Sequence, residues 1–342
     1  MSQIAYLDGS TVLYWGSLVL VLGLAAGLSL SLALYPRYNR HSAAVWVFFP
    51  FALLLGLFFA RVIYWYCHLE QFGSFLEAIA DYNRGSYALF GVIFGVWLAA
   101  LAVKKLGLVQ RMGRLLDAVA PGLSLAFAFV RLSELFNTAC RSRITVHAKL
   151  LQRLPFAVQS TDGGVTSWPL AVFFYSFLLL LAVTVLLVRF YQRYRRYPML
   201  DGSSPNGNVF RLFLLLWGVT EVVIDSLRYD SCFMHFTFLK GLNPYASFVS
   251  LGQIFAAVTI LAVLIHFTAI RVRGGNGGWK LIVAWLLYLA SLVGAGYFGE
   301  YKVQRSANYA LCYPIQIVSL LVMTAVVLWT YRGCLYKDDV EE

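Results

Sequence analysis

The chain has 342 residues, of which 60% are hydrophobic and 13% are charged, and its formal net charge is +11 at pH 7. This composition excludes an ordinary soluble domain, because apolar runs repeatedly reach the roughly 20 residues that a helix needs to cross a bilayer. The charge does not indicate a nucleic-acid partner, since the basic residues lie in short segments between apolar runs. Long alternating segments typical of membrane barrels are absent. We therefore expect an all-α, polytopic membrane helix bundle.

Nine segments are predicted to span the membrane. They cover about residues 11–34, 43–66, 86–104, 115–137, 168–189, 208–228, 246–270, 279–298 and 309–331. The first has no basic segment before it and is longer than the apolar core of a signal peptide, so it is predicted to be a retained span.

Charges in the loops predict the orientation of these spans. Lys and Arg are concentrated in alternate loops, whereas the loop with Glu70, Glu77 and Asp81 is acidic. Because cytoplasmic loops carry the excess of Lys and Arg, we expect an extracytoplasmic N-terminus and a cytoplasmic C-terminus. The loop from Arg141 to Ser167 is basic on the outer side, which is either a tolerated exception or a contact for an anionic headgroup.

A glycine-rich joint, Gly274–Gly278, precedes the last two predicted spans. Such a sequence is typical of a flexible connection. We expect residues 1–273 to form a seven-span core, and residues 274–342 to form a two-span appendage with a short cytoplasmic tail.

Two predicted spans contain ionisable residues, which are costly in a bilayer and therefore mark candidate functional sites. Arg131 and Glu134 are three residues apart and share a helix face, so they are also candidates for a structural ion pair. Glu221 and Asp225 share another face, where like charges repel unless a cation lies between them. We expect Arg131 to point into a polar cavity with these two acids. Asp117, near the start of its span, is expected to form hydrogen bonds between helices.

Short motifs across about residues 10 to 270 resemble those of the prolipoprotein diacylglyceryl transferases. They are Tyr14-Trp15-Gly16, Ala60-Arg61-Val62-Ile63-Tyr64, Asp117-Ala118-Val119-Ala120-Pro121 and Ser250-Leu251-Gly252-Gln253. Further family positions fall on Arg131, Asn137, Arg143 and Arg228. That family moves the diacylglyceryl group of phosphatidylglycerol onto the cysteine thiol of a lipoprotein precursor.

Several positions depart from the family pattern. The histidine of the family's H-G-G motif is replaced by Leu89, and the asparagine of G-R-x-x-N is replaced by Glu134. The arginine of the family's R-x-x-x-E motif is replaced by Glu221, which reverses the charge at that position. The polar side chains of the family's H-P-S-Q-L-Y-E block are also missing from the corresponding segment at residues 168–174.

The resemblance implies a membrane transferase that holds a phosphodiester with arginines, which can bond two oxygens at once, and activates a thiol with a base or a cationic site. The residues implied in substrate binding are Tyr14, Arg61, Asn137, Arg143, Arg228 and Gln253. Those implied in catalysis are Arg131, Glu134, Glu221 and Asp225, where one acid would take the role of the missing histidine.

The expected partners are phosphatidylglycerol or a similar anionic phospholipid and lipoprotein precursors, in the bacterial plasma membrane. No cofactor is expected, and no metal, because the five histidines are scattered without metal-ligand spacing. Two alternatives stay open: a phospholipid-binding relative without catalysis, and a small-solute transporter with an ion relay. The absence of clear internal repeats argues against a transporter.

Four cysteines lie on the expected outer side, where disulfides can persist, namely Cys67, Cys140, Cys232 and Cys312. They allow three pairings, and the sequence leaves open whether any bridge forms. Cys334 is expected to be cytoplasmic and free.

Overall fold

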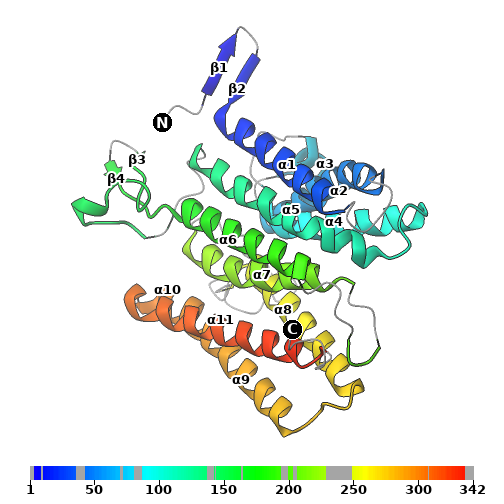
Figure 1. Ribbon diagram of the computed structural model, residues 1–342. Helices are drawn as coiled ribbons and strands as arrows, with labels where there is room; N and C mark the ends of the chain where they lie inside the picture. Colours follow the sequence, from blue (N-terminus) through cyan, green and yellow to red (C-terminus); the bar gives the residue numbers. More distant parts are fainter. Residues whose placement is uncertain are drawn as a thin grey trace. The chain divides into compact units, whose positions relative to one another are not determined.

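The computed structural model describes residues 4–8, 11–35, 43–69, 72–80, 87–136, 142, 144–162, 165–193, 199–202, 206–228, 249–306 and 308–335. Most of these residues are helical, which confirms the expected all-α bundle (Figure 1). The long helices are α1 (Trp15–Leu34), α2 (Ala43–Cys67), α4 (Leu89–Lys105), α5 (Met112–Ser133), α6 (Val172–Arg193), α7 (Asn208–Leu227), α8 (Leu251–Arg273), α9 (Trp279–Gly296) and α11 (Tyr309–Arg332). They coincide with the nine predicted segments, with ends shifted by a few residues.

Short elements extend or connect these helices. The 3-10 helix η3 (Glu134–Phe136) continues α5, and the π-helix η7 (Tyr297–Lys302) and the short α10 (Val303–Ser306) continue α9. The remaining short helices are α3 (Phe75–Ala80) and η4 (Lys149–Leu151).

Seven of the described helical segments are long and apolar enough to cross a membrane. They are Trp15–Leu34, Ala43–Cys67, Met112–Phe136, Val172–Arg193, Leu251–Arg273, Trp279–Lys302 and Tyr309–Arg332. Of the other two predicted spans, α4 has only 17 residues, and α7 carries Arg211, Glu221 and Asp225. The chain is thus a multi-pass membrane protein, and the nine-span count and the orientation of the termini stay predictions.

Two small hairpins were not predicted. Strands β1 (Ile4–Asp8) and β2 (Thr11–Tyr14) pair antiparallel, as do β3 (Ser160–Asp162) and β4 (Val165–Ser167). The first span was predicted to start at about residue 11, whereas the helix begins at Trp15. The physical reason is that Thr11–Tyr14 contains β-branched and aromatic residues, which suit a strand, and pairs with the segment before it.

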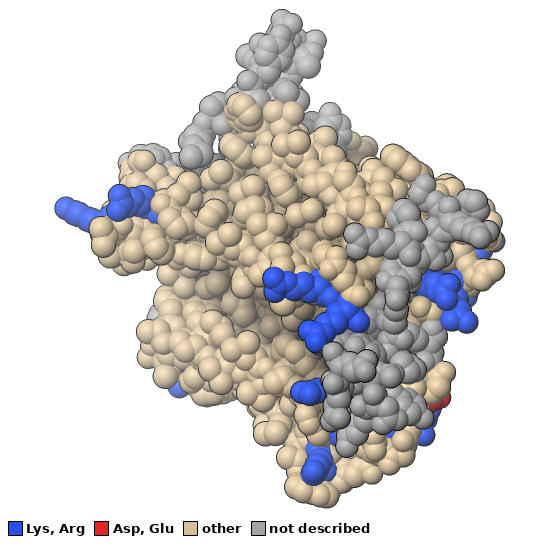
Figure 2. All heavy atoms as spheres, viewed as in Figure 1, with Lys and Arg blue, Asp and Glu red and all other residues tan. Residues whose placement is uncertain are grey.

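Much of the described surface is apolar, as helices in contact with acyl chains require. On the face shown in Figure 2, Lys and Arg form separate groups on a surface that is mostly neither basic nor acidic. Large apolar side chains are exposed along helices that qualify as spans, among them Leu54, Val258, Leu286 and Leu321. Extensive exposed apolar surface of this kind marks a membrane contact.

The chain divides into two compact units. Unit 1 comprises Met1–Ser42, Ala118–Arg189 and Leu227–Ser231, and unit 2 comprises Ala43–Asp117, Phe190–Ser226 and Cys232–Glu342. Three of the boundaries fall within α5, α6 and α7. The predicted division into a seven-span core at residues 1–273 and a two-span appendage at residues 274–342 has different boundaries, and it stays a prediction.

In unit 1, small residues let α1 approach α5 closely. A Cβ atom added at Gly27 would overlap the backbone of Gly122, and one added at Gly23 would overlap the side chain of Phe129. Small residues at helix interfaces are typical of membrane bundles, where packing replaces the hydrophobic effect. The hydroxyl of Ser124 donates to the carbonyl of Leu180 at 3.1 Å, which links α5 to α6.

In unit 2, α2 and α4 meet at glycines, since a Cβ atom at Gly91 would overlap the backbone of Ala60. The first turn of α7 is held by Asp117, whose carboxylate accepts from the backbone N–H groups of Gly207 at 2.6 Å and Phe210 at 3.1 Å. A buried carboxylate at a helix N-terminus satisfies donors that have no partner within the helix. The prediction that Asp117 forms hydrogen bonds between helices is confirmed.

The described cysteines form no disulfide with one another. Cys67, Cys312 and Cys334 are free and buried, so Cys67 and Cys312 follow the alternative in which no bridge forms. Cys140 and Cys232 lie outside the described residues.

Candidate functional site: a buried arginine–glutamate cluster

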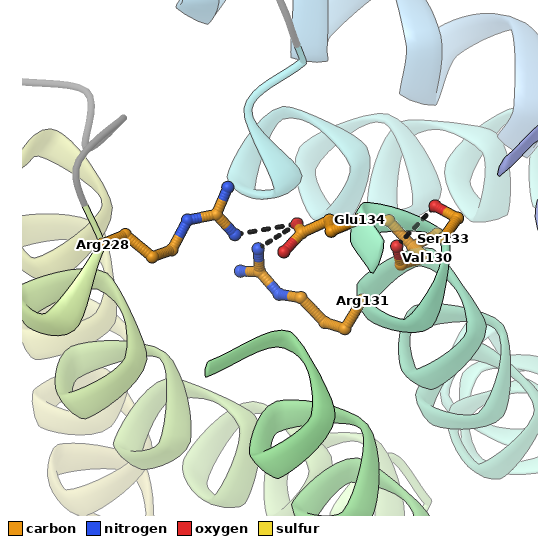
Figure 3. Close-up of polar contacts among 5 residues, drawn as sticks. All are labelled: Val130, Arg131, Ser133, Glu134 and Arg228. Atoms are coloured by element: carbon orange, nitrogen blue, oxygen red, sulfur yellow. Dashed lines mark hydrogen bonds and ion pairs between the residues drawn. The ribbon is translucent and has the colours of Figure 1, made fainter. Parts of the chain in front are cut away.

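Among the described residues of unit 1, three charged side chains meet at the end of α5. Arg131 Nη1 lies 2.7 Å from Glu134 Oε1, and Arg228 Nη1 lies 2.8 Å from the same oxygen. Figure 3 shows the two guanidinium groups converging on Glu134 from different parts of the chain. We call Arg131, Glu134 and Arg228 the arginine cluster.

The helix end creates this geometry. Arg131 lies in the last turn of α5, and Glu134 begins η3, so the three-residue spacing keeps both side chains on one face. The hydroxyl of Ser133 turns back and donates to the carbonyl of Val130 at 2.7 Å (Figure 3). Glu134 also accepts from Arg228, which lies 94 residues further along the chain.

Backbone contacts fix the position of Arg228. Ser142 and Arg228 form an antiparallel bridge directly after α7. The hydroxyl of Ser142 donates to the carbonyl of Leu227 and accepts from the N–H of Ile144, both at 3.1 Å. The segment that follows α5 therefore pairs with the end of α7, and this pairing sets where the Arg228 side chain begins.

The arginine cluster is buried and has a net charge. Arg131 is 3% exposed, Arg228 is 8% exposed, and the Glu134 side chain is 13% exposed. Two guanidinium groups and one carboxylate together carry a formal charge of +1. Because Arg offers a planar set of five donors that matches carboxylate and phosphate oxygens, this arrangement is suited to an anionic group.

Arg61 lies in unit 2, in a different environment. Its Nε donates to the carbonyl of Ala78 at 2.6 Å, and its Cζ lies 5.1 to 5.6 Å from the ring centroids of Phe72, Tyr87 and Tyr64. A guanidinium among aromatic faces gains cation–π stabilisation. Arg61 therefore ties α3 to α2, and its expected role as a headgroup ligand stays a prediction.

A second polar group in unit 2 connects α7, α8 and η7. The hydroxyl of Ser250 donates to Asp225, and the Gln253 amide donates to Glu300 and, at 3.2 Å, to the carbonyl of Val222. Ser250 and Gln253 also form a capping box at the start of α8. We call Asp225, Ser250, Gln253 and Glu300 the polar chain.

The sequence predicted only part of the polar chain. Gln253, a candidate substrate ligand from the sequence, bridges helices: its carbonyl oxygen accepts from the N–H of Ser250, and its amide donates twice. Glu300 was missed, although an acid two residues beyond the predicted span at residues 279–298 was a visible signal. Glu300 is 5% exposed, and it lies in the π-helix η7.

The structure brings some of the expected site residues together and separates others. Arg131, Glu134 and Arg228 form one cluster, in which Arg131 is buried and forms the ion pair with Glu134 that their spacing offered as one alternative. Glu221 and Asp225 belong to unit 2, so their common cavity with Arg131 stays a prediction.

Tyr14 ends β2 and is 49% exposed. The remaining two expected residues lie outside the described ones, namely Asn137 and Arg143.

Comparison with known proteins agrees with the resemblance found in the motifs. The family described as prolipoprotein diacylglyceryl transferase matches residues 3–269. The chain belongs to the prolipoprotein diacylglyceryl transferase family. The match includes the whole arginine cluster and ends within α8, so α9, η7 and α11 lie beyond it.

Curated members of the prolipoprotein diacylglyceryl transferase family are similar to the chain over most of their length. The phosphatidylglycerol–prolipoprotein diacylglyceryl transferase of Finegoldia magna is 23% identical over 260 residues, which is 76% of this chain and 94% of the relative. That of Acaryochloris marina is 28% identical over 238 residues, or 65% of this chain and 78% of the relative. That of Oceanobacillus iheyensis is 24% identical over 242 residues, which is 68% of this chain and 79% of the relative.

Proposed function

We propose that this protein transfers the diacylglyceryl group of phosphatidylglycerol, or a similar anionic phospholipid, to the cysteine thiol of a lipoprotein precursor. The observation that carries the proposal is the buried arginine cluster, which lies inside the family match at residues 3–269. Two guanidinium groups on one acid, with a formal charge of +1, provide the donors that a phosphodiester needs.

The reaction requires stabilisation of a leaving phosphate. The sulfur of the thiolate forms a bond to the terminal glycerol carbon of the diacylglyceryl group, and the bond between this carbon and the phosphate oxygen breaks. The electron pair leaves with the phosphate, so negative charge increases on the oxygens near the arginines. Donors that are already positioned where charge develops lower the barrier most effectively.

Within this proposal, Arg131 and Arg228 hold the phosphate, and Glu134 positions the two guanidinium groups before the lipid enters. Glu221 and Asp225 are the remaining candidates for the group that accepts the thiol proton, because Leu89 occupies the place of the family's histidine. The further proposed lipid contacts are Tyr14, Arg61, Asn137 and Arg143. The reaction would take place on the extracytoplasmic side of the plasma membrane.

A second candidate function is phospholipid binding without turnover. The observation that favours it is Leu89, which begins α4 and has no group that can accept a proton. In that case, the arginine cluster would bind the headgroup, and the thiol would not be activated.

Complementation distinguishes these two functions. The gene for this protein is expressed in a bacterium depleted of its own transferase, and the lipidation of a reporter lipoprotein is followed by its gel shift. We expect rescue by the unchanged protein and none by Arg131→Gln. Failure of the unchanged protein, together with phosphatidylglycerol that co-purifies with it, would favour the binding function instead.

A further inference from the structure

A cavity of about 220 Å³ lies within unit 2, among α7, α8, α9, η7 and α11. Figure 1 shows α9 and α11 side by side, next to α8. Most of the lining is aliphatic, including Val222, Ile254, Ala257, Leu292, Leu320 and Met323. An apolar cavity of about 150 Å³ is already large enough to hold benzene, so this one has room for several carbons of a chain.

The cavity also has a polar part, which consists of Gln253, Glu300 and Gln316. Gln316 on α11 is completely buried, and neither its amide oxygen nor its amide nitrogen has a hydrogen-bond partner among the described residues. Buried side-chain amides are almost always satisfied, because burial without a partner costs roughly 1–3 kcal/mol. The Gln316 amide is thus a buried donor and acceptor in the wall of an apolar cavity.

Local backbone structure holds this amide in place. Gly299 lies in the π-helix η7, and a Cβ atom added there would overlap the Gln316 side chain. Single π-helical turns within α-helices occur frequently at functional sites. Gly299 therefore provides the space that the Gln316 amide occupies beside Glu300.

We propose that this cavity binds a long-chain lipid with an uncharged hydroxyl head. A hydroxyl can donate to the oxygen of Gln316 and accept from its nitrogen, whereas an ammonium group can only donate and would leave that nitrogen without an acceptor. Glu300 already accepts from the Gln253 amide, so an ammonium group would have to compete for it. A carboxylate or phosphate head is disfavoured by the buried acid Glu300. The site therefore selects for hydrogen bonding without charge, in contrast to the arginine cluster.

The chain would enter from the hydrophobic surface of the bundle. Val258 lines the cavity and is 57% exposed on α8, a helix that qualifies as a membrane span. The cavity is smaller than the roughly 300 Å³ at which pockets for drug-sized molecules begin. We infer that the head and the first carbons lie inside, while the rest of the chain extends into the bilayer.

This site goes beyond the proposed transferase function. Glu300 and Gln316 lie after residue 269, where the family match ends, while Gln253 and Val222 lie within it. The site thus gives the last two long helices a ligand of their own, and it can be tested without any transfer assay.

Four photoreactive probes with the same C18 chain test the proposal: an alcohol, its methyl ether, an amine and a carboxylate, each with a diazirine close to the head. The full chain is placed in phosphatidylcholine nanodiscs, and labelled peptides are identified by mass spectrometry. We expect saturable labelling of α8, α9 and α11 by the alcohol, at least fivefold above the other three probes. Gln316→Leu should reduce labelling by the alcohol to the level of the ether.

Two further variants make the result decisive. Gln192→Leu, at an exposed position on α6, is the matched control and should leave labelling unchanged. Ala257→Phe fills the cavity and should block all four probes, which covers the case in which Gln316→Leu fails to fold. The proposal is overturned if the alcohol and the ether label equally, if a charged probe labels more strongly, or if Ala257→Phe has no effect.

Discussion

The arginine cluster in unit 1 and the polar chain in unit 2 accommodate their acids, which are buried or half-buried, in different ways. Glu134 accepts from two guanidinium groups, which leaves a formal charge of +1 among the three side chains. Asp225 accepts from the hydroxyl of Ser250, and Glu300 accepts from the amide of Gln253. An excess of cations suits the binding of an anion, whereas hydroxyl and amide donors connect helices without adding positive charge. The cluster is therefore the better candidate for chemistry on a phospholipid.

The largest expected effect is on the free energy of unfolding, and it tests the role of Glu134 between the two guanidinium groups. Glu134→Gln removes the only negative charge of the cluster and leaves two buried guanidinium groups without it. Removing one partner of a buried ion pair lowers the free energy of unfolding by about 3–5 kcal/mol. We therefore expect a clear drop in the unfolding midpoint of this variant in detergent. Glu77→Gln is the matched control, because Glu77 is exposed and accepts from the N–H of Gly73. Equal midpoints for both variants would contradict the structural role given to Glu134.

The next largest expected effect is on the rate of diacylglyceryl transfer. Arg131→Gln and Arg228→Gln each remove one cation from the proposed phosphate site, and loss of one such group typically slows a reaction about 10²- to 10³-fold. Transfer of labelled diacylglyceryl to a lipoprotein peptide measures this rate. Arg332→Gln, at an exposed position at the end of α11, should transfer at the unchanged rate. A loss in Arg332→Gln as large as in Arg131→Gln would mean that the effect is not specific to the cluster.

A smaller effect is expected in the polar chain. Gln253→Leu leaves Glu300 and the carbonyl of Val222 without this donor, and an unsatisfied buried group costs about 1–3 kcal/mol. The unfolding midpoint should fall, while phosphatidylglycerol binding should stay within about twofold of the unchanged protein. A selective loss of lipid binding, without loss of stability, would assign Gln253 to the substrate site instead.

The sequence predicted the helices far better than their contacts. Apolar runs of about 20 residues identify spans directly, since the bilayer sets their length. The two hairpins were missed because strands of three to five residues carry little periodic signal. Arg131 and Glu134 were predicted as a pair because their spacing places them on one helix face.

Contacts between distant segments could not be predicted in the same way. The contact of Arg228 with Glu134, 94 residues away in the sequence, depends on the bridge between Ser142 and Arg228, which no local pattern predicts. Gln316 lies inside a predicted span without any charge to mark it, and only the packing of five elements shows that it lines a cavity. Packing of this kind has no local sequence signature.

The smallest expected effect concerns the buried thiol after α11. Burial raises the pKa of Cys334 to about 12, so almost no thiolate is present between pH 7 and pH 9. Because the thiolate is the reactive form, alkylation by iodoacetamide should be slow in the folded protein and should become fast in denaturant. Rapid modification of Cys334 in the folded protein at pH 7 would show that the thiol is accessible and ionised.

Phosphatidylglycerol affinity tests the central claim most directly, because it reports on the arginine cluster without requiring turnover. Binding of phosphatidylglycerol and of phosphatidylcholine is measured by native mass spectrometry for the unchanged protein and for Arg131→Gln, Arg228→Gln and Arg332→Gln. We expect at least tenfold weaker binding of phosphatidylglycerol in the first two variants, and no change in the third or for phosphatidylcholine. Equal affinity of all four proteins for phosphatidylglycerol would contradict the assignment of the headgroup site to Arg131, Glu134 and Arg228.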